Sequence, residues 1–130
     1  TDLFKQDQRT WPGKVWHFKK SIMTEKEFDK LVRQLNNYAE EIRLAKRPEY
    51  TLENSDVLTN FRNTAERLGI SELKCFGVFF DKQLQSIFSH INNANLKKSE
   101  PIHSRFADVI NYCYLGYALF VERDGKKKIN

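Results

Sequence analysis

Six polar residues stand where the surrounding apolar pattern of the sequence predicts buried helix faces, and their types could bind a ligand. An amide side chain can read the edge of a ring, a guanidinium can hold a phosphate, and a phenol can stack against a flat group. Carboxylates could orient a Mg²⁺ ion or the hydroxyls of a ligand. The six candidates are Asp56, Asn60, Arg105, Asp108, Asn111 and Tyr112.

Four of the candidates fall on one expected helix near the C-terminus. Arg105, Asp108 and Tyr112 are three and four positions apart, so they share one stripe, with Asn111 beside it. The other two candidates stand four positions apart on an earlier helix, and the two stripes could line one cleft. In such a cleft we expect Arg105 to hold a phosphate and Asp56 and Asp108 to orient Mg²⁺ or hydroxyls. The asparagines would read the edge of a ring, and the tyrosine would stack against it.

The same residues also have a structural interpretation, which the spacing alone leaves open. Asp56 lies in the first turn of its expected helix, where a carboxylate stabilises the helix dipole. Arg105 and Asp108 could form a weak ion pair across three positions. Tyrosines such as Tyr112 and Tyr114 are more often core or interface residues than stacking platforms.

Familiar catalytic signatures are absent from the sequence. It has no glycine-rich phosphate loop, no HExxH and no GxSxG motif, and His17, His90 and His103 lack the spacing of metal ligands. No catalytic residue is therefore assigned, and binding of a ligand is favoured over its hydrolysis.

The elements that must position these residues are helices, because apolar residues recur three and four positions apart through most of the chain. The first helix is expected from Thr24, which opens a capping box, to Arg47-Pro48. A second begins near Asn54 or Ser55 and ends at Gly69.

A third helix is expected after a Ser71 cap and continues through Ile91. Gly77 inside it costs about 1 kcal/mol relative to Ala, and it indicates either a close helix approach or a tolerated substitution. The fourth helix begins at Pro101 and ends near Gly125. It is apolar nearly all round after its polar stripe, which predicts a central element or a subunit interface and favours a homodimer.

The chain of 130 residues thus predicts one all-α domain, a compact bundle of about four helices over residues 24–123. Residues 1–23 are expected to form an irregular aromatic arm, and residues 124–130 a basic flexible tail. Large aromatic side chains are costly to leave in water, so the arm is a candidate partner-binding segment. Its aromatic candidates are Trp11, Trp16 and Phe18.

The net charge of +5 comes from the two ends of the chain. Residues 21–121 hold 13 basic and 13 acidic side chains, and the other 29 residues hold 9 basic and 4 acidic ones. A nucleic-acid-binding domain usually spreads basic side chains over a folded face. Nucleic acid is therefore a less favoured partner than a small molecule or a protein.

Hydropathy predicts a cytoplasmic protein with no membrane partner. No run of about 20 apolar residues is present, and the first residues lack the apolar segment of a signal peptide. Cys75 and Cys113 each stand among aromatic and aliphatic residues without a neighbouring His, which predicts buried free thiols and not a metal site.

Two pairs of short segments carry recognisable motifs. Lys46-Arg47-Pro48-Glu49-Tyr50 precedes Asp56-Val57-Leu58-Thr59-Asn60-Phe61, and Glu100-Pro101-Ile102 precedes Arg105-Phe106-Ala107-Asp108-Val109-Ile110-Asn111-Tyr112. They resemble the nucleotide-modification-associated helical domains, a family of small phage and prophage proteins. In that family a Lys-rich DY turn precedes a D-x-x-x-N-F helix, and an R-x-x-D-x-x-N-Y helix closes the domain. The resemblance covers about residues 43–123.

The resemblance implies a helical cytoplasmic protein of a phage-infected bacterium that acts in nucleotide metabolism or base modification. The six candidate residues occupy the matching motif positions. Glu49 stands where the family often has Asp, and Lys82-Gln83 stands where a Lys-His pair is common, which removes a potential general base.

The function expected from sequence is binding of a nucleotide or nucleotide-derived ligand in a polar cleft between helices. One alternative is a non-catalytic phage protein that inhibits a host enzyme or defence system. Another is a protein that sequesters a nucleotide signal instead of processing it.

Overall fold

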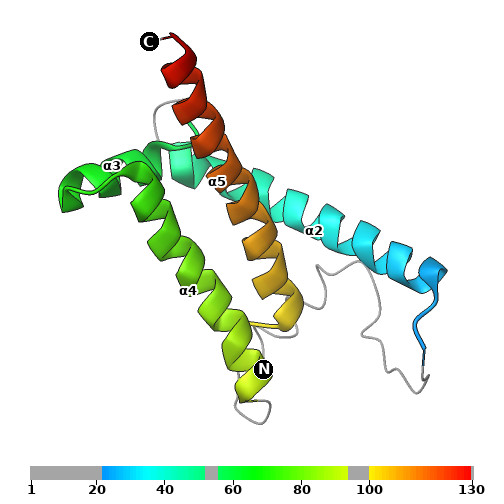
Figure 1. Cartoon of the computed structure of the whole chain (residues 1–130). Coiled ribbons are helices and arrows are strands. Elements are labelled where there is room, and N and C mark those ends of the chain that lie inside the picture. Colours follow the sequence, from blue (N-terminus) through cyan, green and yellow to red (C-terminus); the bar gives the residue numbers. More distant parts are fainter. Residues whose placement is uncertain (1–21, 52–55, 94–99, 130) are drawn as a thin grey trace.

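The computed structural model describes residues 22–51, 56–93 and 100–129, and within these ranges the chain forms four helices and no strand (Figure 1). The all-α prediction is therefore confirmed. The aromatic residues of the expected N-terminal arm lie outside the described residues. The helices are α2 (Glu25–Thr51), α3 (Thr59–Leu68), α4 (Glu72–Asn92) and α5 (Ile102–Ile129).

Local hydrogen bonds fix three helix ends as the sequence predicts. The Thr24 hydroxyl accepts from the Glu27 amide at 3.1 Å, and a Glu27 carboxylate oxygen accepts from the Thr24 amide at 3.3 Å. Ser71 caps α4 by accepting from the Lys74 amide at 3.1 Å. Gly69 ends α3 in the left-handed conformation (φ 67°, ψ 34°), which favours glycine.

Two predicted boundaries around the first connection are wrong. α2 continues through Pro48 to Thr51, although a proline inside a helix donates no N–H and its ring crowds the carbonyl oxygen four residues earlier. α3 begins at Thr59, later than expected, because Asp56 first forms a turn in which its carboxylate accepts from the Leu58 amide at 3.0 Å.

The predicted end of the last helix is also wrong. α5 runs through Gly125 and continues to Ile129, where a basic flexible tail over 124–130 was expected. A glycine inside a helix costs only about 1 kcal/mol relative to alanine, so Gly125 does not by itself stop α5.

α5 is the central element, because it packs against α2 on one side and α4 on the other (Figure 1). Two buried clusters meet on it. The larger joins α3, α4 and α5 and consists of Leu58, Phe61, Ala65, Cys75 and Leu119. The smaller joins α2 and α5 and consists of Tyr38, Ala39 and Ala107.

The close approach of α4 and α5 depends on Gly116. A Cβ added to this buried glycine would overlap the ring of Phe76, which fills the space above it. A Cβ added to Gly77 would meet no atom within 4 Å. Gly77 is therefore the tolerated substitution, and the glycine that permits close packing is on the opposite helix.

The two cysteines differ in environment. Cys75 is buried, as the sequence predicts, whereas Cys113 is exposed and the prediction for it is wrong. The face of α5 that carries Cys113 is apolar but points away from the core, so apolar neighbours in sequence did not imply burial. Among the described residues, the search for a helix both long and apolar enough to cross a bilayer finds none.

Candidate ligand-binding site

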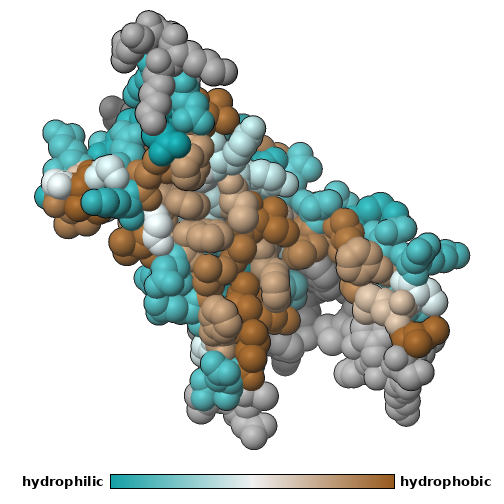
Figure 2. Space-filling view, in the orientation of Figure 1, coloured by the Kyte–Doolittle hydropathy of each residue, from teal (hydrophilic) through white to brown (hydrophobic). Residues whose placement is uncertain are grey.

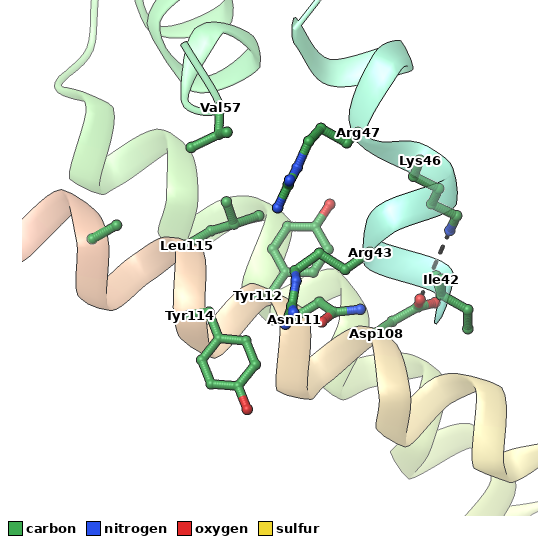
Figure 3. Close-up of a pocket in the computed structure, with 11 residues that line it drawn as sticks. Ile42, Arg43, Lys46, Arg47, Val57, Asp108, Asn111, Tyr112, Tyr114 and Leu115 are labelled. Carbon is green, nitrogen blue, oxygen red and sulfur yellow. Dashed lines mark ion pairs between the residues drawn. The ribbon is translucent and has the colours of Figure 1, made fainter. Parts of the chain in front are cut away.

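A pocket of about 250 Å³ lies between α2 and α5, where the two buried clusters meet (Figure 3). Basic side chains come from α2, polar and aromatic ones from α5, and one valine from the turn before α3. The lining residues are Ile42, Arg43, Lys46, Arg47, Val57, Asp108, Asn111, Tyr112, Tyr114, Leu115 and Ala118.

The α2 wall is cationic. Arg43 and Arg47 are four positions apart, and Lys46 lies between them, so all three project from one side of the helix. Figure 3 shows Arg43 and Arg47 extending from α2 toward the wall formed by α5. The guanidinium of Arg43 lies 5.5 Å from the ring centroid of Tyr114, which holds it at the pocket rim by a cation–π contact.

Asp108 is the carboxylate of this pocket, and it is largely buried. Its Oδ1 lies 3.9 Å from Lys46 Nζ, the ion pair drawn in Figure 3. Burial raises the pKa of Asp108 above its ordinary value, and the nearby Lys46 opposes that rise only in part. Three basic side chains against one acid leave the pocket lining positively charged.

Asn111 is held by the backbone of α2. Its Nδ2 donates to the carbonyl oxygen of Ala39 at 3.0 Å, which fixes the orientation of the amide. Its Oδ1 is buried and accepts no hydrogen bond from the described residues. Unmet buried acceptors are rare in folded proteins, and Asn111 carries one although its residue also lines the pocket.

Tyr112 belongs to the core and to the pocket at once. Its ring centroid lies 6.4 Å from those of Phe61 and Phe76, and it also lines the cavity. Beside it a smaller hollow of about 80 Å³ contains Asn60 and shares Val57, Tyr112 and Leu115 with the main pocket. Asn60 therefore adjoins the site through Tyr112 and does not line the main pocket.

Asp56 contacts Arg62 and does not line the pocket. Arg62 Nε donates to Asp56 Oδ2 at 2.6 Å, and the same guanidinium lies 3.0 Å from Glu72 and 2.7 Å from Glu122. This cluster of one arginine and three acids joins the start of α3 to α4 and α5. The arginine bonds hold the pKa values of Asp56 and Glu122 below their ordinary range and raise that of Arg62.

Arg105 also lies outside the pocket lining. Its Nη1 is 3.4 Å from a carboxylate oxygen of Glu100, just before α5 begins. Of the six candidates, the structure therefore brings Asp108, Asn111 and Tyr112 together. Asn60 adjoins them, and Asp56 and Arg105 take part in ion pairs elsewhere.

A Mg²⁺ site built from Asp56 and Asp108 does not fit this arrangement. Asp56 accepts hydrogen bonds from Arg62 and from the Leu58 amide, whereas Asp108 lies beside Lys46. Within residues 22–51, 56–93 and 100–129, no group of three or more His, Cys, Asp and Glu side chains could hold a metal ion.

The reasoning from sequence missed the three cations of α2 as pocket residues. The signal was present, because Lys46 lies four positions after Ile42 on the apolar stripe and Arg47 directly follows it. Arg62 gave no such signal, since two of its three partners are 10 and 60 residues away. Comparisons with protein-family models, with curated proteins and with solved structures find no match to this chain.

Proposed function

We propose that the protein binds a nucleotide or a nucleotide-derived ligand in the pocket between α2 and α5. The observation that carries this proposal is that two chemically different walls face each other across a pocket of about 250 Å³. One wall presents Arg43, Lys46 and Arg47, and the other presents a carboxylate, an amide and two phenol rings. A ligand with a phosphate and a polar ring matches both walls.

The phosphate end would lie at the α2 wall. Guanidinium and ammonium groups bind phosphate by charge-assisted hydrogen bonds, and a concave site concentrates their field. Arg43, Lys46 and Arg47 thus take the role that the sequence alone assigned to Arg105.

The ring and sugar would lie against α5. Tyr114, already in contact with the Arg43 guanidinium, and Tyr112 supply flat surfaces. The carboxylate of Asp108 suits hydroxyl or N–H donors. The volume is at the small end of ligand pockets, so one nucleotide is favoured over a dinucleotide.

The resemblance of the short motifs to those of the phage nucleotide-modification-associated domains supports this proposal, because the resembling segments and the pocket have residues in common. These are Lys46, Arg47, Asp108, Asn111 and Tyr112. A phage protein in the bacterial cytoplasm that binds a nucleotide, or sequesters a nucleotide signal, fits the proposal. The alternative role against a host enzyme or defence system rests on the arm with Trp11, Trp16 and Phe18, outside the described residues. A second copy of the chain is the proposed protein partner.

Isothermal titration calorimetry tests the proposal with inorganic phosphate and with nucleoside mono- and triphosphates, each with and without Mg²⁺. The variant Arg43→Ala/Lys46→Ala should bind at least about 10-fold more weakly than the wild type, the effect of losing charge-assisted hydrogen bonds. Arg33→Ala removes a positive charge from the same helix outside the pocket and should bind as the wild type does. Equal affinity of the two variants, or no binding to the wild type, would overturn the proposal.

A further inference from the structure

The face of α5 opposite its buried side is apolar and exposed along most of its length. Figure 2 shows a band of hydrophobic surface over α5 and the adjoining part of α4. Phe106 is 44%, Tyr117 73% and Phe120 44% exposed, Cys113 is exposed and Val109 is half-buried. None of these five residues lines the ligand pocket. We call Phe106, Val109, Cys113, Tyr117 and Phe120 the α5 stripe.

The spacing within the α5 stripe is the same read in either direction. Its successive intervals are three, four, four and three residues, with Cys113 at the midpoint. If a second α5 ran antiparallel with the two-fold axis at Cys113, Phe106 would face Phe120 of the second copy, and Val109 would face Tyr117 of the second copy. An interface between identical subunits requires this kind of self-complementarity, and intervals of three and four suit helix-to-helix packing.

The exposed apolar area is of the size that such an interface needs. Aromatic side chains carry about 150–250 Å² each, so the three partly exposed rings of the α5 stripe supply roughly 300 Å². α4 extends the face, because Phe76 covers Gly116 and stacks on Phe80 at 5.3 Å. With the further exposed side chains, the face approaches roughly 600 Å² per partner, the lower end of the range for specific interfaces. The further exposed side chains are Ile102 and Val121 on α5 and Phe88 and Ile91 on α4.

We infer that the α5 stripe binds the α5 stripe of a second copy of this chain in an antiparallel, two-fold symmetric dimer centred on Cys113. Packed helix axes lie about 8–10 Å apart, and Cα atoms lie about 2.3 Å from each axis. The two Cys113 Cα atoms would then be roughly 4–5 Å apart, a separation that a disulfide can bridge. The inference goes beyond the proposed ligand site and stands independently of it.

Sedimentation velocity of the full chain over a range of concentrations tests for the dimer. Tyr117→Lys should weaken dimerisation about 30-fold or more, because it places a charge inside the interface, one helical turn from its axis. Leu44→Lys makes the same kind of change at another half-exposed apolar residue, on α2, and should leave the dimer intact. A wild-type chain that stays monomeric, or a dimer that Tyr117→Lys leaves unchanged, would overturn the inference.

Charge pairs distinguish the antiparallel arrangement from a parallel one. Phe106→Glu and Phe120→Lys should each weaken the dimer, and the double variant Phe106→Glu/Phe120→Lys should recover at least about 10-fold of the loss, because opposite charges then face each other across the axis. The double variant Phe106→Lys/Phe120→Lys should not recover the lost dimer affinity. The two positions are about 21 Å apart within one helix, so the pair cannot form inside one chain. No difference between the double variants would overturn the antiparallel geometry.

Oxidation tests the position of the axis. Mild oxidation should cross-link wild-type dimers through Cys113. Cys113→Ser should abolish the cross-link but leave the dimer affinity measured by sedimentation unchanged. Cys75→Ala, which removes the buried thiol, should leave the cross-link in place. A dimer that forms no Cys113 cross-link would overturn the axis at this residue. Binding of the monomeric chain to vesicles of anionic lipid, with no dimer, would assign the face to a membrane instead.

Discussion

The two sides of α5 bury different kinds of side chain. Toward α3 and α4, α5 joins an aromatic core in which the ring centroid of Phe61 lies 5.9 Å from those of Phe76 and Phe79. Arg62 and its three carboxylate partners close this core. Toward α2 the buried apolar cluster is small, consisting of Tyr38, Ala39 and Ala107, and a pocket opens beside it. One side is built for packing, and the other keeps polar groups at a cavity.

Polar contacts hold the α2 side together. Tyr38 and Ser104 share a buried hydrogen bond of 3.0 Å, and Asn111 donates to the Ala39 carbonyl oxygen. Such bonds each contribute about 1 kcal/mol net, less than a buried aromatic ring. Stability should therefore depend mainly on the α3–α4 side and the proposed ligand binding on the α2 side, and mutations on each side should show it.

Phe61→Ala should have the largest effect on stability, because it empties the centre of the aromatic core. Phe61 is only 4% exposed, and removal of such a ring lowers the free energy of unfolding by about 3–5 kcal/mol. Tyr38→Phe on the α2 side removes the hydrogen bond to Ser104 and should cost about 1 kcal/mol. Urea denaturation measures both, and equal losses would contradict the contrast between the two sides.

Arg62→Ala should lower the free energy of unfolding by about 1–2 kcal/mol, because three carboxylates lose their shared partner. We expect a smaller loss than for a fully buried network, because the Arg62 side chain is 29% exposed. Arg67→Ala on the same helix removes an exposed arginine and should change stability little. A loss that is no larger for Arg62 than for Arg67 would show that the cluster adds no stability.

The Arg62 contribution should also depend on pH in a defined direction. The native pKa values of Asp56 and Glu122 are lowered from 3.8 and 4.5, so the stability they provide is full above those values. It is lost as the pH falls through the lowered native pKa values. The difference between wild type and Arg62→Ala should therefore be constant near neutral pH and shrink in acid. Denaturation at a series of pH values measures it.

Replacing a glycine by alanine on the two facing helices α4 and α5 should change the free energy of unfolding in opposite directions. Gly116→Ala places a methyl group where the Phe76 ring lies, and overpacking should cost about 1 kcal/mol or more after the gain in helix propensity. Gly77→Ala meets no neighbour and should stabilise α4 by about 0.5–1 kcal/mol. Thermal unfolding compares the pair, and the same sign for both would contradict the close packing at Gly116.

Asp108→Asn should have the smallest effect on stability, with an expected free energy of unfolding at pH 7 that is equal to or above that of the wild type. Burial raises the pKa of Asp108, so the charged form is held at a cost that the amide avoids. As the pH falls through the raised native pKa toward the ordinary value, the free energy of unfolding of the wild type should rise relative to that of the variant. A large loss of stability at pH 7 would instead make the pair with Lys46 a stabilising contact.

Local signals in the sequence predicted the helices and their caps. Thr24, Gly69 and Ser71 each form cap hydrogen bonds with residues three or four positions away, so the local sequence was sufficient to predict them. The apolar periodicity likewise predicted α5 as a helix apolar nearly all round, and the structure places it at the centre.

Contacts between distant residues account for what the sequence did not predict. Asp56 has the spacing of a site residue, yet its partner Arg62 also binds Glu72 and Glu122 from two other helices. Arg105 shares a stripe with Asp108 but pairs with Glu100 before the helix. Helical spacing shows which residues share a face, and only the packing of helices shows what that face meets.

Chemical-shift mapping of the ¹⁵N-labelled full chain with a nucleoside monophosphate tests the separation of the two sides most directly. We expect shifts concentrated at the end of α2 around Arg43 and Lys46 and along α5 at Asp108 and Asn111, with the amides around Arg62 unchanged. Arg43→Ala/Lys46→Ala should abolish these shifts while leaving the rest of the spectrum folded. Shifts centred on the α3–α4 side, or none at millimolar nucleotide, would contradict a ligand site between α2 and α5.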